Sequence, residues 1–257
     1  MKFLSNPRII AVSSGKGGVG KTNCVANLAM YFAGINKKVL ILDADLGLCN
    51  IDVLFGIRHK YNIKHVLNGM KSLKDIILEG PMGIRIIPAG SGIQELTNIN
   101  NEQRQKLIST LEQYDMPVDV VLIDTGAGIA DNVLFFCDCA HEIVVVTTPE
   151  PTSITDAYAL IKLLSRNKVE RNISVLINMA RSEQEAMEAF RQIAYTVDLF
   201  LPISVNYLDY LPSDPNFRVA IRAQRAFISM FPNSSFARRL ARIGDKLMER
   251  QLYVCCR

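Results

Sequence analysis

The hydrophobic positions of this 257-residue chain fall into short, almost uninterrupted apolar runs that alternate with segments of helical periodicity. Runs such as VVLI at 120–123 and IVVV at 143–146 contain no polar position. Such runs are typical of strands that are buried on both faces of a parallel sheet. The pattern therefore predicts an α/β fold, a doubly wound and mostly parallel sheet with helices on both faces.

The same pattern places the individual elements. The predicted strands are Arg8–Ser13, Lys38–Asp43, Gly83–Pro88, Val118–Asp124, Glu142–Thr147, Ile173–Asn178 and roughly Phe200–Tyr207. The predicted helices are Thr22–Ala33, Ile63–Leu67, Ser72–Leu78, Glu102–Tyr114, Asp131–Phe136, Thr155–Ser165, Glu183–Thr196, Arg218–Phe227 and Phe236–Gln251. No repeat or low-complexity tract interrupts the alternation. We therefore expect one domain over residues 1–257, with residues 236–252 as its last helix.

Residues 15–22, GKGGVGKT, match the phosphate-binding pattern G-x-x-x-x-G-K-[ST] in full, between the first predicted strand and the first helix. Glycines allow successive backbone N–H groups to turn toward an anion, and a helix N-terminus attracts negative charge. In such a loop Lys21 reaches the β- and γ-phosphates, and the Thr22 hydroxyl ligates Mg²⁺. The sequence thus predicts a nucleotide site at Gly15, Lys16, Gly17, Gly18, Val19, Gly20, Lys21, Thr22 and Asn23.

Acidic residues follow two of the predicted strands. Asp43 and Asp45 come at the end of the second strand, and Asp124 closes the apolar run of the fourth, as in a Walker B element. The carboxyl ends of parallel strands meet at one edge of the sheet, beside the phosphate loop. We therefore predict that Asp43, Asp45 and Asp124 join Thr22 around Mg²⁺. Gly126 would let the next loop respond to the γ-phosphate.

A second lysine precedes the usual one, and KGGVGKT at 16–22 resembles the deviant Walker A sequence of the MinD/ParA group of P-loop ATPases. In that family the early lysine, here Lys16, crosses a dimer interface to the phosphates of the partner's nucleotide. The resemblance implies an ATP- and Mg²⁺-dependent homodimer, in which two stacked nucleotides need additional cations.

Further stretches resemble the same family. DADLGLCNID at 43–52 is similar to switch I, which implies that Asp45 orients the attacking water and that Asn50 belongs to the switch. With Lys16 and Lys21, Asp45 completes the implied catalytic set. IDTGAGI at 123–129 is similar to Walker B followed by switch II. The implied adenine contacts are Asn178, Arg181, Pro212 and Asp214, and the acids implied to pair with Lys16 are Glu150 and Asp156.

Within this group the chain resembles the FleN/FlhG flagellar-number regulators over nearly its whole length, for example in EPTSITDAYALIKLL at 150–164. The resemblance implies a slow regulatory ATPase that restrains a flagellar transcription activator of the AAA+ enhancer-binding type. It also implies a flagellar-placing GTPase as a further partner. Seven residues precede the first predicted strand, so we expect no N-terminal helix of the kind that some members use with that GTPase.

The sequence also bears on where in the cell the protein is expected. No apolar run reaches 18 residues, and MKFLSNPR is too short and polar for a signal peptide. We therefore expect a cytoplasmic protein; attachment at the inner membrane or cell pole stays an alternative. The six cysteines are expected to be free thiols, although Cys137 and Cys139 leave open the less favoured class of iron–sulfur carriers.

The end of the chain is basic. Residues 216–257 carry nine Lys or Arg and two acids, a net charge of +7, whereas the whole chain is +4. This keeps open a DNA-partition ATPase of the ParA type or a membrane-bound division-site ATPase of the MinD type. We expect no sequence-specific nucleic-acid binding. Phe236, Leu240, Ile243 and Leu247 form one apolar stripe, which we expect to pack on the sheet rather than on lipid.

Overall fold

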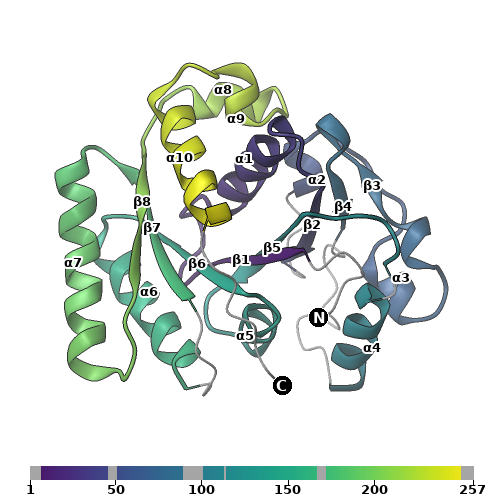
Figure 1. Ribbon diagram of the computed structural model, residues 1–257, viewed down its shortest axis with the longest axis horizontal. Helices are drawn as coiled ribbons and strands as arrows, with labels where there is room; N and C mark the ends of the chain where they lie inside the picture. Colours follow the sequence, from purple (N-terminus) through teal and green to yellow (C-terminus); the bar gives the residue numbers. More distant parts are fainter. Residues whose placement is uncertain (1–6, 46–50, 89–100, 113, 167–171, 250–257) are drawn as a thin grey trace.

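The computed structural model describes residues 7–45, 51–88, 101–112, 114–166 and 172–249. Within these ranges the strands form one eight-stranded sheet in the order β3-β4-β2-β5-β1-β6-β7-β8 (Figure 1). Neighbouring strands run parallel except β3 and β4, which are antiparallel. The strands are β1 (Arg8–Ser14), β2 (Val39–Ala44), β3 (Leu78–Glu79), β4 (Arg85–Ile87), β5 (Val120–Ala127), β6 (Glu142–Thr147), β7 (Asn172–Ala180) and β8 (Asn206–Pro212).

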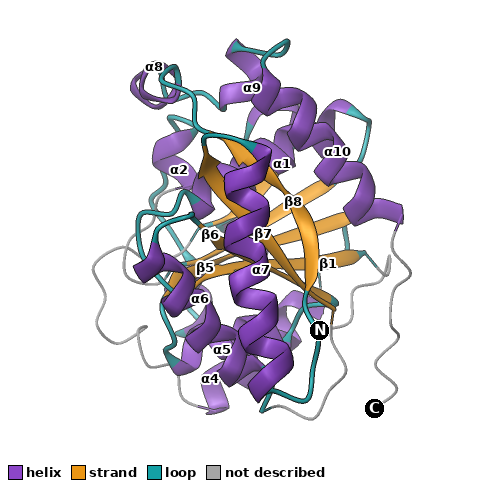
Figure 2. Cartoon of the chain, turned by 90° about the vertical axis from the view of Figure 1, so that its left-hand side faces the viewer, coloured by secondary structure: helices purple, strands orange, loops and turns teal. Residues whose placement is uncertain are grey.

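Helices cover both faces of the sheet, as the apolar runs predict. One face is covered by α1 (Lys21–Gly34), α2 (Ile51–Leu54), α8 (Phe217–Arg222), α9 (Phe227–Met230) and α10 (Ser235–Glu249). The other is covered by α3 (Ile63–Leu67), α4 (Asn101–Glu112), α5 (Asp131–Asp138), α6 (Pro151–Leu164) and α7 (Glu183–Phe200). Figure 2 looks at the β8 edge, with α7 in front of the sheet. The predicted doubly wound fold is confirmed.

The side chains of β1 alternate between the two cores, which explains why the central strands consist of continuous apolar runs. Ile9 and Ala11 pack into the core beneath α5 and α6, whereas Ile10 and Val12 pack into the core beneath α1 and α10. All four side chains are buried. Because successive side chains of a strand point to opposite faces, a strand with a core on each side is apolar at consecutive positions.

Two predicted helices are wrong in detail. Residues 72–78 form a 3₁₀ turn, Leu73–Asp75, followed by β3, because the Ser72 hydroxyl and backbone N–H both donate to the Asp75 carboxylate and close a tight turn. Residues 218–227 do not form one helix either. Gln224 has φ 52°, in the left-handed region, and this residue separates α8 from α9.

The predicted strand at 200–207 is displaced. The apolar stripe of α7, with Ala189, Ile193 and Val197, continues the helix to Phe200, and Pro202 follows shortly after its end. The strand begins at Asn206 and runs to Pro212. This shift places β8 as the strand that leads directly into the loop after Pro212. Helix α2 was not predicted.

The last helix packs on the sheet, as predicted for its apolar stripe. The four stripe residues of α10 are buried in the core that α1 and β8 share with it. Gly244 allows the close approach of α1, because a Cβ there would lie 2.4 Å from the ring of Tyr31. The stripe is therefore occupied within the fold, and the predicted extension to residue 252 falls outside the described residues. Among the described residues, no helix is both long and apolar enough to cross a bilayer.

Candidate nucleotide site

The phosphate loop connects β1 to α1 at the carboxyl edge of the sheet. Gly18 and Gly20 have φ values of 80° and 86°, which residues with a Cβ rarely adopt. Gly15 is required for a different reason: a Cβ there would lie 2.0 Å from the backbone oxygen of Asp156 on α6. The Ser14 hydroxyl donates to the carbonyl of Lys16 and holds the turn. The loop is thus shaped by contacts on both sides before any ligand is considered.

Lys21, the first residue of α1, is buried, with 7% of its side chain exposed. Its Nζ lies 2.8 Å from Oδ1 of Asp124 on β5. Burial raises the pKa of the Asp124 carboxyl, while Lys21 and Thr22 act in the opposite direction. The other oxygen, Asp124 Oδ2, is buried and makes no hydrogen bond to any residue that the structure describes. A buried oxygen of this kind is available to a ligand that arrives with the nucleotide.

Strand register brings the three predicted acids together. Asp43 on β2 lies directly opposite Asp124 on β5, and the backbone N–H of Asp45 donates to Asp43 Oδ1 at 3.1 Å. Asp45 also faces Gly126, since a Cβ on that glycine would lie 3.8 Å from Asp45 Oδ1. The charge of Asp45 contributes to the raised pKa of Asp124.

These groups fit Mg²⁺ as one part of its shell. Among the described residues there is no cluster of three His, Cys, Asp or Glu that would hold a metal without other ligands. Mg²⁺ normally keeps several waters and takes one or two carboxylates plus phosphate oxygens. The unpartnered Asp124 Oδ2 beside Thr22 therefore suits a metal that arrives with a phosphate group.

Lys16 lies in a different environment from Lys21. Its side chain is 39% exposed, and its Nζ lies 2.9 Å from Thr152 Oγ1 and 3.4 Å from Glu150 Oε2, both at the start of α6. The predicted pairing with Glu150 is thus present within one chain. Asp156 meets the loop through its backbone, against Gly15. Asn50 lies outside the described residues.

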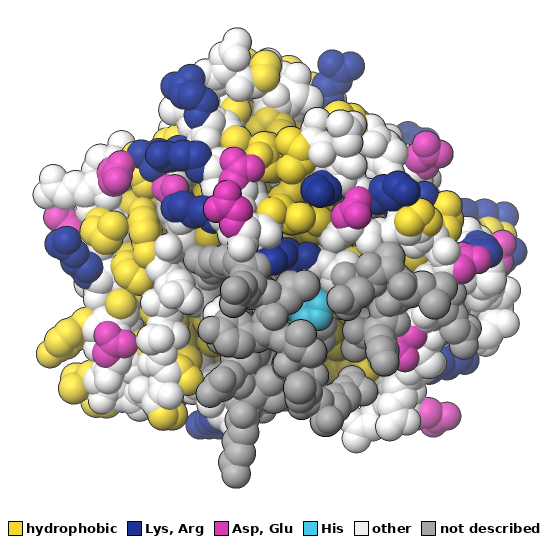
Figure 3. Space-filling model, viewed as in Figure 1, with side chains coloured by type: hydrophobic (Ala, Val, Ile, Leu, Met, Phe, Trp, Pro, Cys, Tyr) yellow, Lys and Arg dark blue, Asp and Glu magenta, His cyan; other side chains and the backbone are white. Residues whose placement is uncertain are grey.

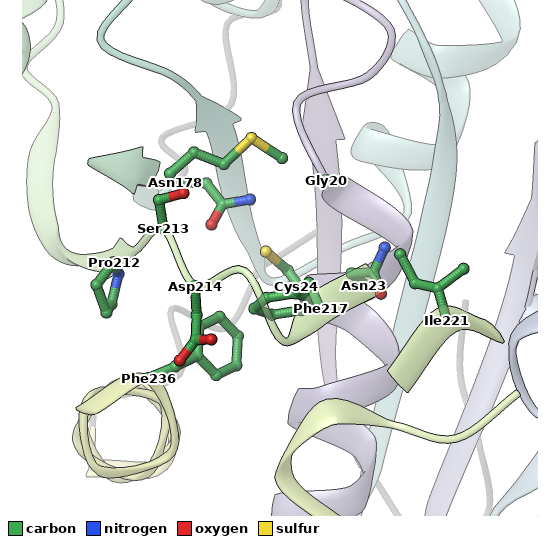
Figure 4. A pocket seen from close by; sticks show the side chains of 11 residues that line it. Gly20, Asn23, Cys24, Asn178, Pro212, Ser213, Asp214, Phe217, Ile221 and Phe236 are labelled. Carbon is green, nitrogen blue, oxygen red and sulfur yellow. The ribbon is translucent and has the colours of Figure 1, made fainter. Parts of the chain in front are cut away.

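A cavity of about 140 Å³ adjoins the end of the phosphate loop (Figure 4). It is lined by Gly20, Asn23, Cys24, Asn178, Met179, Pro212, Ser213, Asp214, Phe217, Ile221 and Phe236. The predicted residues Asn23, Asn178, Pro212 and Asp214 are among them. Arg181 is not: it is exposed, and its backbone N–H donates to Glu185. Its predicted role stays a prediction.

Asn178 has a fixed orientation in this cavity. Its Nδ2 donates to the carbonyl of Val19 at 2.8 Å, which directs the amide nitrogen toward the phosphate loop. In Figure 4 the amide nitrogen lies on the Gly20 side and the oxygen points into the cavity. The group presented to a ligand is therefore a hydrogen-bond acceptor.

The aromatic wall of the cavity was not predicted from the sequence. Phe217 stacks on Phe227 with ring centroids 4.2 Å apart, and both contact Phe236 on α10. The apolar stripe of the last helix predicted that Phe236 would be buried, but nothing in its spacing showed which site it would line. Cys24 was likewise not predicted to line the site. Burial raises the pKa of its thiol to about 12, so it stays protonated and unreactive at neutral pH.

The chain is similar to known proteins over most of its length. The ParA family, described as "NUBPL iron-transfer P-loop NTPase", matches residues 6–248. The antiactivator FleN of Pseudomonas aeruginosa is 42% identical over 240 residues, which cover 93% of this chain and 86% of FleN. The flagellum site-determining protein YlxH of Helicobacter pylori is 33% identical over 246 residues, with 95% and 83% covered.

Among solved structures, the MinD cell division protein of Aquifex aeolicus matches with a TM-score of 0.78 at 25% identity, over 95% of this chain and 98% of MinD. The family match and the relatives cover nearly all the described residues, including the phosphate loop and the cavity beside it. The chain therefore belongs to the ParA family of P-loop NTPases.

Proposed function

We propose that this protein is an ATP-binding and ATP-hydrolysing molecular switch that dimerises with ATP and regulates flagellar number. The observation that carries the proposal is the arrangement around Lys21. A buried lysine and a buried carboxylate with one unpartnered oxygen stand at the foot of a phosphate loop, next to a cavity of suitable chemistry for a base. This is the constellation that a nucleoside triphosphate with Mg²⁺ requires.

The cavity favours adenine. Asn178 presents its amide oxygen to the cavity, while one N–H of its amide nitrogen donates to the carbonyl of Val19. An acceptor in this position suits the exocyclic amino group of adenine, whereas guanine carries an oxygen there. A buried acceptor that faces another acceptor loses a hydrogen bond, a loss of about 1–3 kcal/mol. We therefore expect ATP to bind in preference to GTP.

Hydrolysis requires a held phosphate and a placed water. In this proposal Lys21 binds the β- and γ-phosphate oxygens, and Thr22 with Asp43, Asp45 and Asp124 would hold Mg²⁺, which would neutralise phosphate charge. Asp45, beside Gly126, orients the attacking water. Its carboxylate lies at the end of β2, where the family resemblance assigns this role. Turnover is expected to be slow, as suits a switch.

The proposed dimer rests on the environment of Lys16. Its side chain is partly exposed and is held by two groups at the start of α6, one of which is 69% exposed. Such a contact is weak, so the lysine can leave it for the phosphates of a nucleotide in a second copy. Ordering of the switch segments by the γ-phosphate would then make the dimer depend on ATP.

The regulatory role rests on the relatives. FleN is named an antiactivator and YlxH a flagellum site-determining protein. We propose that the ATP dimer of this chain restrains an AAA+ enhancer-binding activator of flagellar genes in the cytoplasm, with a flagellar-placing GTPase as a further partner. The other candidate functions have less support. Arg239, Arg242 and Lys246 of α10 contact Asp209, which offsets part of the basic charge that DNA or lipid would need, and Cys137, one of the two cysteines considered for an iron–sulfur site, is buried.

The proposal is tested with the tagged full chain as bait in a lysate of its own host, with ATP, with ADP and without nucleotide. The expected result is retention of an enhancer-binding activator with ATP alone, and none by the Lys21→Ala chain. A clean deletion should give cells with too many flagella. Normal flagellar numbers would refute the flagellar role and leave the ATPase assignment standing, whereas failure to bind ATP would refute both.

A further inference from the structure

A buried carboxylate on the edge strand β8 is surrounded by the basic side chains of α10. Asp209 has 8% of its side chain exposed, and Arg239, Arg242 and Lys246 approach it at 2.9, 3.8 and 3.2 Å. Lys246 also donates to the carbonyl of Leu208 at 2.7 Å. A register shift in the pairing of β7 with β8 occurs at this point of β8. The basic end of the chain is therefore partly neutralised inside the fold.

Arg239 joins three elements. One terminal nitrogen, Nη1, donates to Asp209 on β8 at 2.9 Å, and the other, Nη2, donates to Glu183 at the start of α7 at 2.8 Å. The guanidinium also lies 3.7 Å from the ring centre of Tyr210. A planar guanidinium suits this task because it can bind two carboxylates and stack on a ring at once. Its side chain is only 19% exposed.

Two of these three elements, β8 and α10, carry part of the wall of the base cavity, and the third, α7, follows β7, which carries another part. Helix α7 begins shortly after β7, whose end supplies Asn178 and Met179. Strand β8 leads into Pro212–Asp214, and α10 supplies Phe236, one turn before Arg239. In Figure 4 the side chains from the end of β7, from Pro212–Asp214 and from α10 converge on one cavity. The guanidinium of Arg239 thus contacts β8 and α7 from α10, at a point outside the cavity that these segments help to form.

We propose that Arg239, held by Asp209 and Glu183, is a positioning residue that sets the separation of the walls of the base cavity. The inference rests on the proposed function, because it assumes that a nucleotide base occupies this cavity. Arg239 does not line the cavity itself. It acts by keeping α10, β8 and the start of α7 in a fixed relation, so that Phe236 and Asn178 contact the two sides of one base.

Loss of Arg239 should affect only the binding of the nucleotide base. The phosphate loop is held by β1, β5 and α6, through Lys21, Gly15 and their neighbours, and none of those contacts involves Arg239. If the walls of the cavity are less firmly held, ATP should bind more weakly, and the preference for ATP over GTP should decrease. Loss of Arg239 should leave the affinity for a bare triphosphate unchanged. It should also leave kcat unchanged at saturating ATP, because Asp45 and the loop are not altered.

The experiment compares the full-length wild type with Arg239→Gln, Arg239→Lys and Glu183→Gln. The matched control is Arg238→Gln, which removes the same charge one position earlier, from an exposed side chain that donates to the carbonyl of Asn233. Dissociation constants are measured by calorimetry for ATP, GTP and inorganic tripolyphosphate, together with KM, kcat and the unfolding midpoint of each variant.

For Arg239→Gln we expect about tenfold weaker ATP binding, the size of one lost charge-assisted hydrogen bond, with tripolyphosphate binding within about twofold of wild type. Arg239→Lys should recover part of this loss, Glu183→Gln should show a smaller one, and Arg238→Gln none. Unchanged ATP affinity in Arg239→Gln would overturn the inference. Equal loss of ATP and tripolyphosphate binding would also overturn it, because the residue would then support the whole fold. A wild type that binds tripolyphosphate but neither nucleotide would refute the proposed function itself.

Discussion

The two lysines of the phosphate loop lie five residues apart and in opposite environments. Lys21 is 7% exposed and its Nζ lies 2.8 Å from Asp124, whereas Lys16 is 39% exposed and its Nζ lies 3.4 Å from Glu150. The partner of the first is fully buried and the partner of the second is mostly in solvent. One loop therefore carries one cation fixed in the core and one that is free to change partners.

The difference in burial decides what each lysine can do. Breaking a buried ion pair leaves an uncompensated charge and costs about 3–5 kcal/mol, whereas an exposed pair contributes about 0–1 kcal/mol. Lys21 is consequently part of both the fold and the site. Lys16 contributes little to the fold, so its position can respond to a nucleotide and a second chain. Four substitutions separate these roles, in order of expected effect.

Lys21→Ala should have the largest effect. It removes the cation for the phosphates, so ATP binding should fall below detection in calorimetry. It also leaves Asp124 buried without its cation, so the free energy of unfolding, measured with urea in the absence of nucleotide, should drop by about 3–5 kcal/mol. A loss no larger than that of Lys16→Ala would contradict the comparison.

The pH dependence of that variant gives a second measurement. Burial holds the pKa of Asp124 above its ordinary value of 3.8, and removal of Lys21 raises the pKa further. A carboxyl with a raised folded-state pKa favours the folded chain when it is protonated, and this contribution is lost as the pH rises through that pKa. The destabilisation should therefore shrink as the pH is lowered toward 3.8. A larger destabilisation by Lys21→Ala at low pH would contradict the assignment of Lys21 as the partner of Asp124.

Asp45→Ala should separate hydrolysis from binding. The carboxylate lies beside Gly126 and outside the contacts that hold Lys21. We expect turnover to fall by about 10²-fold, as for the loss of a group that positions or activates water, while the ATP dimer persists. Phosphate release measured at saturating ATP tests this, with the wild type beside it. Near-normal turnover would reject the role of Asp45.

Lys16→Ala should bind ATP within about threefold of wild type and fail to dimerise. Truncating one partner of a charge pair across an interface costs about 2–5 kcal/mol, which is roughly 30-fold or more in the dimer dissociation constant. Sedimentation with ATP and Mg²⁺ measures the dimer, and urea unfolding should show less than about 1 kcal/mol of change. Normal ATP-dependent dimerisation would remove Lys16 from the interface.

The structure brings together the groups that the sequence assigned to a phosphate site, because these groups lie at strand ends or within one continuous motif. Asp43 and Asp124 face each other through strand register, which parallel pairing of two apolar runs implies. The base half was predicted less completely. Phe217 and Phe236 reach the cavity from separate helices near the end of the chain, and their distance from Asn178 is set by tertiary packing rather than by any local pattern.

Fold prediction shows the same division. Glu142–Thr147 and Ile63–Leu67 were predicted to the residue, because each has clear chemical boundaries. The errors fall where competing local contacts decide. A side-chain hydrogen bond from Ser72 to Asp75 ended a predicted helix, and a left-handed Gln224 divided another. The role of Arg239 could not be predicted. From the sequence alone, an arginine on a helix is interpreted as a surface residue, and only the structure shows its contacts with Asp209 and Glu183.

Glu150→Gln should have the smallest effect and tests the other side of the comparison. The substitution removes the negative charge near Lys16 and leaves the 2.9 Å contact with Thr152 intact. Because Glu150 is mostly exposed, the free energy of unfolding should change by less than about 0.5 kcal/mol. In this position the acid competes with the partner's phosphates for Lys16, so its loss should strengthen the ATP dimer by about twofold at low salt, an advantage that fades as salt screens the pair. Sedimentation across a salt series, with Asp131→Asn as a surface control at the start of α5, measures both effects. A destabilisation comparable to that of Lys21→Ala would show that the Lys16 contact is part of the fold, and the contrast between the two lysines would be wrong.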